Sequence, residues 1–165
     1  MRSARLALAF TLTTACAMGS RPPSGPPGRA VVAHVVDGDT IDVTIGGHRE
    51  RVRLLGINTP EVVDPRKPVE CYGPEASALT KKLLSPGTEV RLVRDVEPRD
   101  DYGRLLAYVY REPDGLFVNL DLVVQGAAVL LTFRPNTSHA VEFATAAAAA
   151  QRAHRGLWAV CRGNP

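Results

Sequence analysis

Residues 52–61 read VRLLGINTPE, an apolar run that contains one cation and stops in a polar cluster. The apolar part, 52–57, predicts a strand with a buried face. Arg53 lies within it, and a buried charge is costly unless it is paired. Taken alone, the stretch is typical of an edge strand with an exposed arginine and a proline turn. Two further polar stretches along the chain favour a functional interpretation.

Patterns on either side of this stretch predict a small β-barrel with helices. Apolar, β-branched or alternating segments bounded by Gly, Pro or Asp predict strands over 30–36, 40–45, 51–57, 89–94 and 105–111. Helical patterns cover 73–84, 119–125 and 138–154. Five short strands with a helix inserted after the third fit a five-stranded OB-fold barrel with about three α-helices, and an SH3-like barrel is the alternative.

The first 17 residues predict an export signal. Two arginines precede an apolar run and then small residues, which is the order of a secretory signal peptide. Ala15-Cys16-Ala17 fits a cleavage site that would release a soluble protein. Residues 13–16 also form a loose lipobox, which would leave Cys16 lipidated and the protein anchored on the outer side of the cytoplasmic membrane. The sequence leaves both forms open.

Residues 18–28 are rich in Gly, Pro and Ser and predict a linker, so the folded domain is expected over 29–165. Without residues 1–17 the chain has 18 basic and 17 acidic side chains. Net charge therefore gives little support for nucleic-acid binding, and any such case rests on local clusters. Cys71 and Cys161 remain as a pair. We expect a disulfide between them in an oxidising compartment, with two buried free thiols as the alternative.

Three separate polar stretches indicate chemistry at a phosphate. They are DGDT (37–40), Arg53 with NTPE (58–61), and DDYGR (100–104). Carboxylate, amide and carbonyl oxygens suit calcium or magnesium, and arginine holds phosphate oxygens bidentately. A glutamate beside a metal can deprotonate water. Each stretch alone is a common turn, but together they predict metal-assisted hydrolysis of a phosphodiester.

Seven motifs follow in a fixed order: VVDGDT (35–40), RLLGINTPE (53–61), PRKPVECYGPEASALTKKLL (65–84), DDYGRLLAYVY (100–110), LVVQGAA (122–128), RPNTSH (134–139) and GLW (156–158). In these motifs the chain resembles the staphylococcal nuclease (thermonuclease) family over about residues 30–160. The resemblance implies a monomeric OB-fold enzyme that uses Ca²⁺ to cut DNA and RNA, preferring unpaired regions. Water would attack phosphorus and leave 3′-phosphate products.

The resemblance also implies roles for the matching residues. The calcium site would be made by Asp39, Asn58 and Thr59, with Asp37 close by. The catalytic residues would be Glu61, which acts on the attacking water, and Arg53 and Arg104, which hold the scissile phosphate and stabilise charge in the transition state. The nucleotide would be bordered by Tyr102, Leu106 and Phe133.

Some positions depart from the family pattern. Asn58 stands where the family usually has Asp, and the lost charge predicts weaker calcium binding with activity retained. Leu131 stands where a stacking aromatic is expected, which leaves Phe133, and stacking is worth about 1–3 kcal/mol per base. Asp101 replaces a cation, while Arg66 and Lys67 could add local positive charge.

Two other functions compete with an exported nuclease. One is a non-catalytic OB-fold module that binds nucleic acid with a decayed site, and the other is a structural envelope lipoprotein. Glu61 separates them, because a binder gains nothing from a carboxylate that repels phosphate. We therefore predict an exported, calcium-dependent nuclease.

Overall fold

A computed structural model describes residues 28–65, 68–112 and 114–161. The expected signal peptide with Cys16, most of the linker, and the loop residues Arg66 and Lys67 lie outside the described residues. Within the described part of the chain, no helix is long and apolar enough to cross a membrane.

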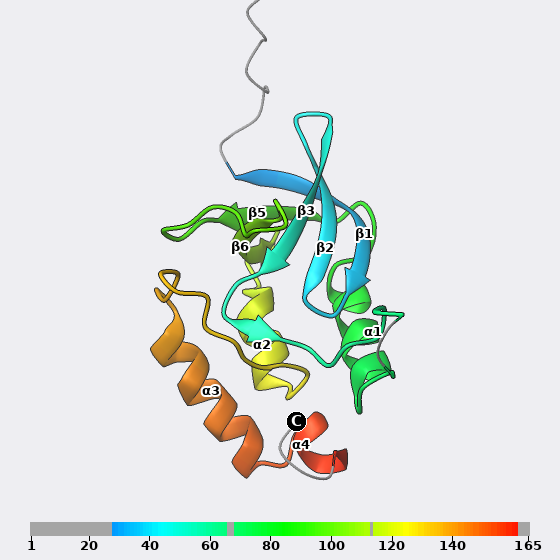
Figure 1. Ribbon diagram of the computed structural model, residues 1–165, viewed down its shortest axis with the longest axis vertical. Helices are drawn as coiled ribbons and strands as arrows, with labels where there is room; N and C mark the ends of the chain where they lie inside the picture. The colour runs from blue at the N-terminus through cyan, green and yellow to red at the C-terminus, as the bar shows by residue number, and fades with distance from the viewer. Residues whose placement is uncertain (1–27, 66–67, 113, 162–165) are drawn as a thin grey trace, which may run out of the picture.

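Five strands form a closed barrel in the order β1-β2-β3-β6-β5 (Figure 1). They are β1 (Arg29–Asp37), β2 (Thr40–Ile45), β3 (His48–Leu54), β5 (Glu89–Val93) and β6 (Leu105–Arg111). Neighbouring strands are antiparallel except β3 and β6, which are parallel. A parallel pair needs a crossover connection, and here it runs through α1 (Gly73–Leu83) and β5. This Greek-key barrel confirms the predicted OB-fold, and the SH3-like alternative is wrong.

The predicted strand 51–57 is broken at Gly56, because the chain turns there. Gly56 has a φ of 80°, which glycine adopts without strain, and a Cβ at this position would overlap the ring of Phe143. Beyond the turn, β4 (Ile57–Asn58) pairs with β7 (Val129–Leu130) in a separate two-stranded sheet. Arg53 and the polar end of the opening stretch therefore belong to different sheets.

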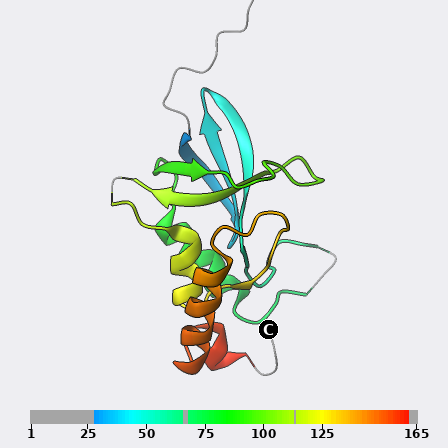
Figure 2. The same cartoon turned by 90° about the vertical axis from the view of Figure 1, so that its left-hand side faces the viewer.

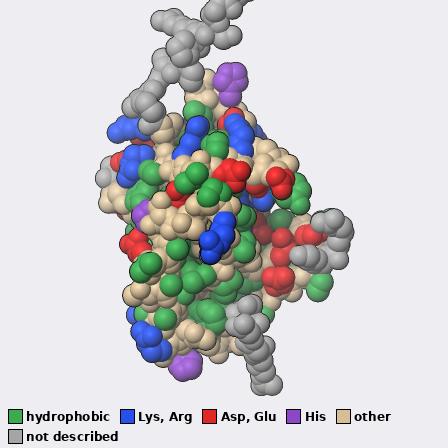
Figure 3. All heavy atoms as spheres, turned by 60° about the vertical axis from the view of Figure 1, so that its left-hand side comes forward, with side chains coloured by type: hydrophobic (Ala, Val, Ile, Leu, Met, Phe, Trp, Pro, Cys, Tyr) green, Lys and Arg blue, Asp and Glu red, His purple; other side chains and the backbone are tan. Residues whose placement is uncertain are grey.

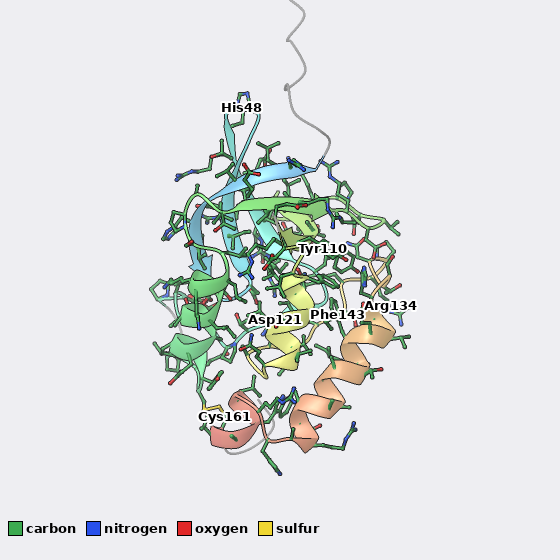
Figure 4. The ribbon with its side chains drawn as sticks, turned by 180° about the vertical axis from the view of Figure 1, so that it is seen from behind. His48, Tyr110, Asp121, Arg134, Phe143 and Cys161 are labelled. Carbon is green, nitrogen blue, oxygen red and sulfur yellow. A yellow bond between two sulfur atoms is a disulfide. The ribbon has the colours of Figure 1, made fainter. Side chains whose placement is uncertain are left out.

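The helices gather at one end of the barrel (Figure 2). Besides α1 they are α2 (Val118–Val124), α3 (Ala140–Arg152) and the short α4 (Leu157–Val160). The alanine-rich α3, built from the best helix former, buries Phe143 among its apolar residues. A disulfide joins Cys71, just before α1, to Cys161, just after α4, with their Cα atoms 5.8 Å apart. Figure 4 shows Cys161 at the end of the molecule opposite His48, which lies at the tip of the β2–β3 hairpin.

Alternation along β2 and β3 separates the barrel core from the outer face. Ile41, Val43 and Val52 are fully buried. Side chains on a strand alternate in direction, so the residues next to these three in the sequence point away from the core. Arg53 is one of them and lies opposite Thr40. It is therefore buried outside the apolar core, against the polar side of the barrel.

Candidate active site

A cavity of about 1090 Å³ collects the predicted site residues. Its walls come from the β1–β2 turn, the outer face of β2 and β3, the segment 58–61, the loop 102–104, and residues 131 and 133. Nine of the ten predicted metal, catalytic and substrate residues line it: Asp37, Asp39, Arg53, Asn58, Thr59, Glu61, Tyr102, Arg104 and Phe133. The tenth, Leu106, is buried in the barrel wall and lines a separate cavity of about 540 Å³.

The arginine of the opening stretch is paired through both of its Nη atoms. Arg53 is only 4% exposed. Its Nη1 donates to the carbonyls of Leu54 (2.8 Å) and Ile57 (2.9 Å). Its Nη2 donates to Asn58 Oδ1 (3.1 Å) and lies 2.9 Å from Asp39 Oδ2. Burial lowers the pKa of Arg53, and the charge of Asp39 opposes that shift. Arg53 thus ties the end of β3 to β4 and to the carboxylate across the cavity.

The DGDT turn and Thr59 approach each other closely. Asp39 Oδ2 accepts the Thr59 N–H (2.9 Å), and Thr80 Oγ1 donates to the Gly38 carbonyl from below (2.7 Å). A Cβ on Gly38 would overlap the Thr59 side chain, so glycine is required for this approach. Thr59 Oγ1 is buried and has no hydrogen-bond partner among the described residues. Thr59 thus carries a buried hydroxyl close to the DGDT turn that no described group binds.

Asp37 and Glu61 share one end of the cavity, and their pKa values are shifted in opposite directions. Burial raises the pKa of Asp37 to about 6, and its hydrogen bond to Glu61 and the nearby charges add to the shift. Glu61 is partly buried, but hydrogen bonds from the N–H groups of 62–64 to Oε1 and from Asp37 outweigh this and lower its pKa. Glu61 is held as an ionised carboxylate. The Glu70 carboxylate accepts the Glu61 N–H (2.9 Å), which closes the base of this loop.

The loop from 99 to 104 presents the second arginine. Asp100 Oδ2 accepts Arg104 Nε at 2.6 Å, and Asp100 Oδ1 accepts the N–H groups of Tyr102 and Arg104. One carboxylate therefore shapes the turn and orients the guanidinium. Tyr102 is 85% exposed, and the Arg104 guanidinium lies 5.4 Å from its ring centroid. Elsewhere in the cavity the Phe133 ring centroid lies 5.3 Å from the Arg53 guanidinium.

The oxygen atoms at the acidic end fit a hard divalent cation. Within the described ranges, no cluster of three or more His, Cys, Asp or Glu side chains has metal-site geometry, so any site has mixed ligands. The available oxygens belong to the carboxylates of Asp37, Asp39 and Glu61, the Thr59 carbonyl and the Asn58 amide. Crowded carboxylates, one of them with a raised pKa, are relieved by a cation, and such oxygens suit Ca²⁺ or Mg²⁺.

Some residues of the cavity were missed from the sequence. The motif DDYGR was recognised, but the role of Asp100 in orienting Arg104 was not. Arg49 and Arg51 also line the cavity. Their signal was the period of two that they share with Arg53, which marks one face of a strand.

Comparison with known proteins gives a consistent result. The family model described as "Staphylococcal nuclease homologue" matches residues 51–160. The thermonuclease of Staphylococcus intermedius is 43% identical over 128 residues, which cover 78% of this chain and 74% of that protein. The thermonuclease of Staphylococcus hyicus is 39% identical over 127 residues, 77% of this chain and 73% of that protein. The SPbeta prophage-derived endonuclease YokF of Bacillus subtilis (strain 168) is 44% identical over 110 residues, 66% of this chain and 36% of YokF.

Proposed function

Because the chain belongs to the staphylococcal nuclease family, we propose that it is a calcium-dependent endonuclease that hydrolyses DNA and RNA. One observation carries the proposal: an ionised glutamate and two oriented arginines line one cavity together with carboxylate, amide and carbonyl oxygens that suit a cation. A structural protein has no reason to concentrate these groups, and a simple binder has no use for Glu61. The named relatives support a nuclease, while the cation and the substrate range are our proposal.

The residues divide the reaction between them. Arg53 and Arg104 bind oxygens of the scissile phosphate and stabilise the charge that develops on them. Both arginines line one cavity, and the charge of Arg104 contributes to the lowered pKa of Arg53. Glu61, ionised and held by backbone N–H groups, orients the attacking water and accepts its proton.

Asp39, Asn58 and the Thr59 carbonyl would hold the calcium ion, with Asp37 beside them. A bound calcium ion supplies positive charge next to the phosphate and positions oxygen atoms around it. The neutral amide of Asn58 supplies one negative charge fewer than Asp would, so the expected calcium affinity is low. Calcium-dependent cleavage that saturates at micromolar calcium would contradict this part of the proposal.

Unpaired bases fit the cavity better than a duplex. Tyr102 offers an exposed ring, and Phe133 lines the same cavity. Aromatic rings stack on unpaired bases irrespective of sequence. The preferred substrates are therefore single strands and unpaired regions, and the proposed enzyme acts as a monomer.

The first test is cleavage of heat-denatured DNA by the purified protein, in calcium and in chelator, with Glu61→Gln purified in parallel. We expect calcium-dependent cleavage, and loss of a general base typically costs about 10²–10⁴ in rate. Wild type and variant that are equally inactive at high calcium, yet still bind DNA, would favour a binding module with a decayed site.

We also propose that the protein is exported, either released after Ala17 or anchored through a lipidated Cys16. The Cys71–Cys161 disulfide supports an oxidising destination. Fractionation of bacteria that express the full chain, with Cys16→Ser as the second sample, tests this proposal. Retention in the membrane that Cys16→Ser abolishes indicates anchoring, and release of both indicates secretion. Cytoplasmic retention of both would overturn export.

A further inference from the structure

Two arginines of the cavity have no part in the proposed reaction. Arg49 and Arg51 lie on β3 and line the same cavity as Arg53. Since alternate strand residues share a face, the three arginines form a row, with about 6.6 Å between neighbours along the strand. The row runs from the scissile position toward the tip of the β2–β3 hairpin, where His48 lies (Figure 4).

Arg51 is oriented by a partner but keeps free donors. Asp42 lies opposite it on β2. Its carboxylate accepts Arg51 Nε (2.8 Å) and Nη2 (3.1 Å). The Asp42 side chain is only 9% exposed, whereas that of Arg51 is 51% exposed. An arginine has five donors, so this contact fixes the plane of the guanidinium and leaves its other side to a ligand.

Arg49 is the outermost arginine of the row, and its charge contributes to the lowered pKa of Asp42. It is exposed and forms no ion pair with any residue in 28–65, 68–112 or 114–161. The loop that carries Tyr102 shares the cavity with it. Arg99 fixes that loop against β3, because it donates both to Glu50 and to the Gly103 carbonyl. The loop of Tyr102 is therefore a fixed wall of the cavity that Arg49 also lines.

The charges along β3 favour a polyanion that runs from the scissile position toward the tip of the β2–β3 hairpin. The other end of the cavity carries Asp37, Glu61 and Glu70. Figure 3 shows acidic side chains gathered at the right edge of one face, with basic ones mostly over its upper part. A strand that leaves the scissile position is attracted along β3, where Arg49 and Arg51 lie. The cavity, about 1090 Å³, also exceeds the roughly 300–1,000 Å³ of sites for small ligands.

We propose that Arg49, together with Arg51 held by Asp42, forms a second phosphate subsite. It binds the phosphate adjacent to the scissile one in a single strand of DNA or RNA. This inference rests on the proposed function, which identifies the scissile position at Arg53 and Arg104. It makes the enzyme favour strands with several phosphates over the smallest diesters.

Binding to strands of different length tests the subsite. The full chain carrying Glu61→Gln is titrated with labelled oligothymidylates that contain one, two or four phosphodiesters, at several salt concentrations. Adding Arg49→Gln should weaken binding of the longest strand about three- to tenfold and lower the slope of log K against log salt by about 0.7, the value for one lost contact to a single strand. The one-phosphate ligand should lose much less.

Two controls accompany this variant. Arg49→Lys keeps the charge and should retain most of the affinity. Arg152→Gln removes an exposed arginine from the last turn of α3 and should change neither affinity nor slope. Equal losses for every strand length, no loss at all, or the same loss in Arg152→Gln would overturn the subsite. Melting temperatures of all variants show that folding is unaffected.

The cleavage assay separates this proposal from the proposed function. If wild type cleaves nucleic acid and Arg49→Gln binds every length as its parent does, the subsite alone is wrong. If wild type cleaves nothing with any divalent cation while the length-dependent loss is present, the nuclease assignment is wrong and the phosphate subsite stands.

Discussion

Two buried polar side chains, Asn119 and Arg53, bind backbone groups in similar ways but lie in different surroundings. Asn119 is fully buried between α2 and the barrel. Its Oδ1 accepts the Val109 N–H, and its Nδ2 donates to the Leu55 carbonyl, both at 2.9 Å. Around Arg53, in contrast, Thr59 Oγ1 has no hydrogen-bond partner within the described part of the chain, and the pKa of Asp37 is raised. Polar groups that are paired within the protein, as at Asn119, stabilise the fold, whereas the cavity around Arg53 keeps polar groups that can bind a ligand.

The largest expected effect on stability comes from the disulfide at the helical end of the molecule. The disulfide joins residues 90 positions apart. Replacing Cys71 and Cys161 with serine should lower the free energy of unfolding by roughly 4–5 kcal/mol in the chain-entropy model. Urea unfolding measures this loss. Activity per folded molecule at low temperature should persist. If this activity falls together with the free energy of unfolding, the helical end also positions the cavity.

For Arg104 we expect the opposite pattern, a loss of activity with stability retained. Arg104→Lys cannot make the bidentate contact to phosphate, and we expect a fall in kcat of about 10²–10³, equal to about 2.7–4 kcal/mol. Its side chain is partly exposed, and its ion pair among the described residues is with Asp100 of its own loop, so the free energy of unfolding should change by no more than about 0.5 kcal/mol. Single-turnover kinetics and urea unfolding on the same preparation separate the two quantities. Asp100→Asn, which frees the guanidinium, should reproduce part of the kinetic loss.

Asn119→Ala tests the closed contact directly. It leaves the Val109 N–H and the Leu55 carbonyl buried without this partner, and the expected loss is about 2–3 kcal/mol in the free energy of unfolding. The KM and kcat of the folded protein should not change. A kinetic effect at a temperature where the variant is fully folded would show that Asn119 transmits to the cavity and would weaken the contrast with Arg53.

The sequence predicts the barrel and most of the cavity for a physical reason. Alternation and turn residues act locally, and nine site residues lie in short motifs at strand ends. The turn at Gly56 and the β4–β7 pairing were missed because both involve residues distant in the sequence. Gly56 packs against the Phe143 ring of α3, and β4 pairs with Val129–Leu130. Leu106 shows the same limit: its motif is recognisable, but the direction of its side chain is set by the barrel register.

The smallest effect concerns Asp37 in metal-free protein. Its pKa is raised from 3.8 to about 6, so the folded state holds a proton that the unfolded state has released. The stability that this proton contributes is present below about pH 4 and is lost as the pH rises through about 6.

Asp37→Asn removes this loss, and in chelator at pH 7 we expect it to raise the free energy of unfolding by about 1–2 kcal/mol, less than the full shift allows. Denaturant unfolding between pH 4 and 7 should show a flatter profile for the variant than for wild type. Glu61→Gln should flatten it in part, because it removes the like charge that adds to the shift. Identical profiles for wild type and Asp37→Asn would mean that the acidic end is as well balanced as the contact at Asn119, and the case for a cation there would lose its electrostatic basis.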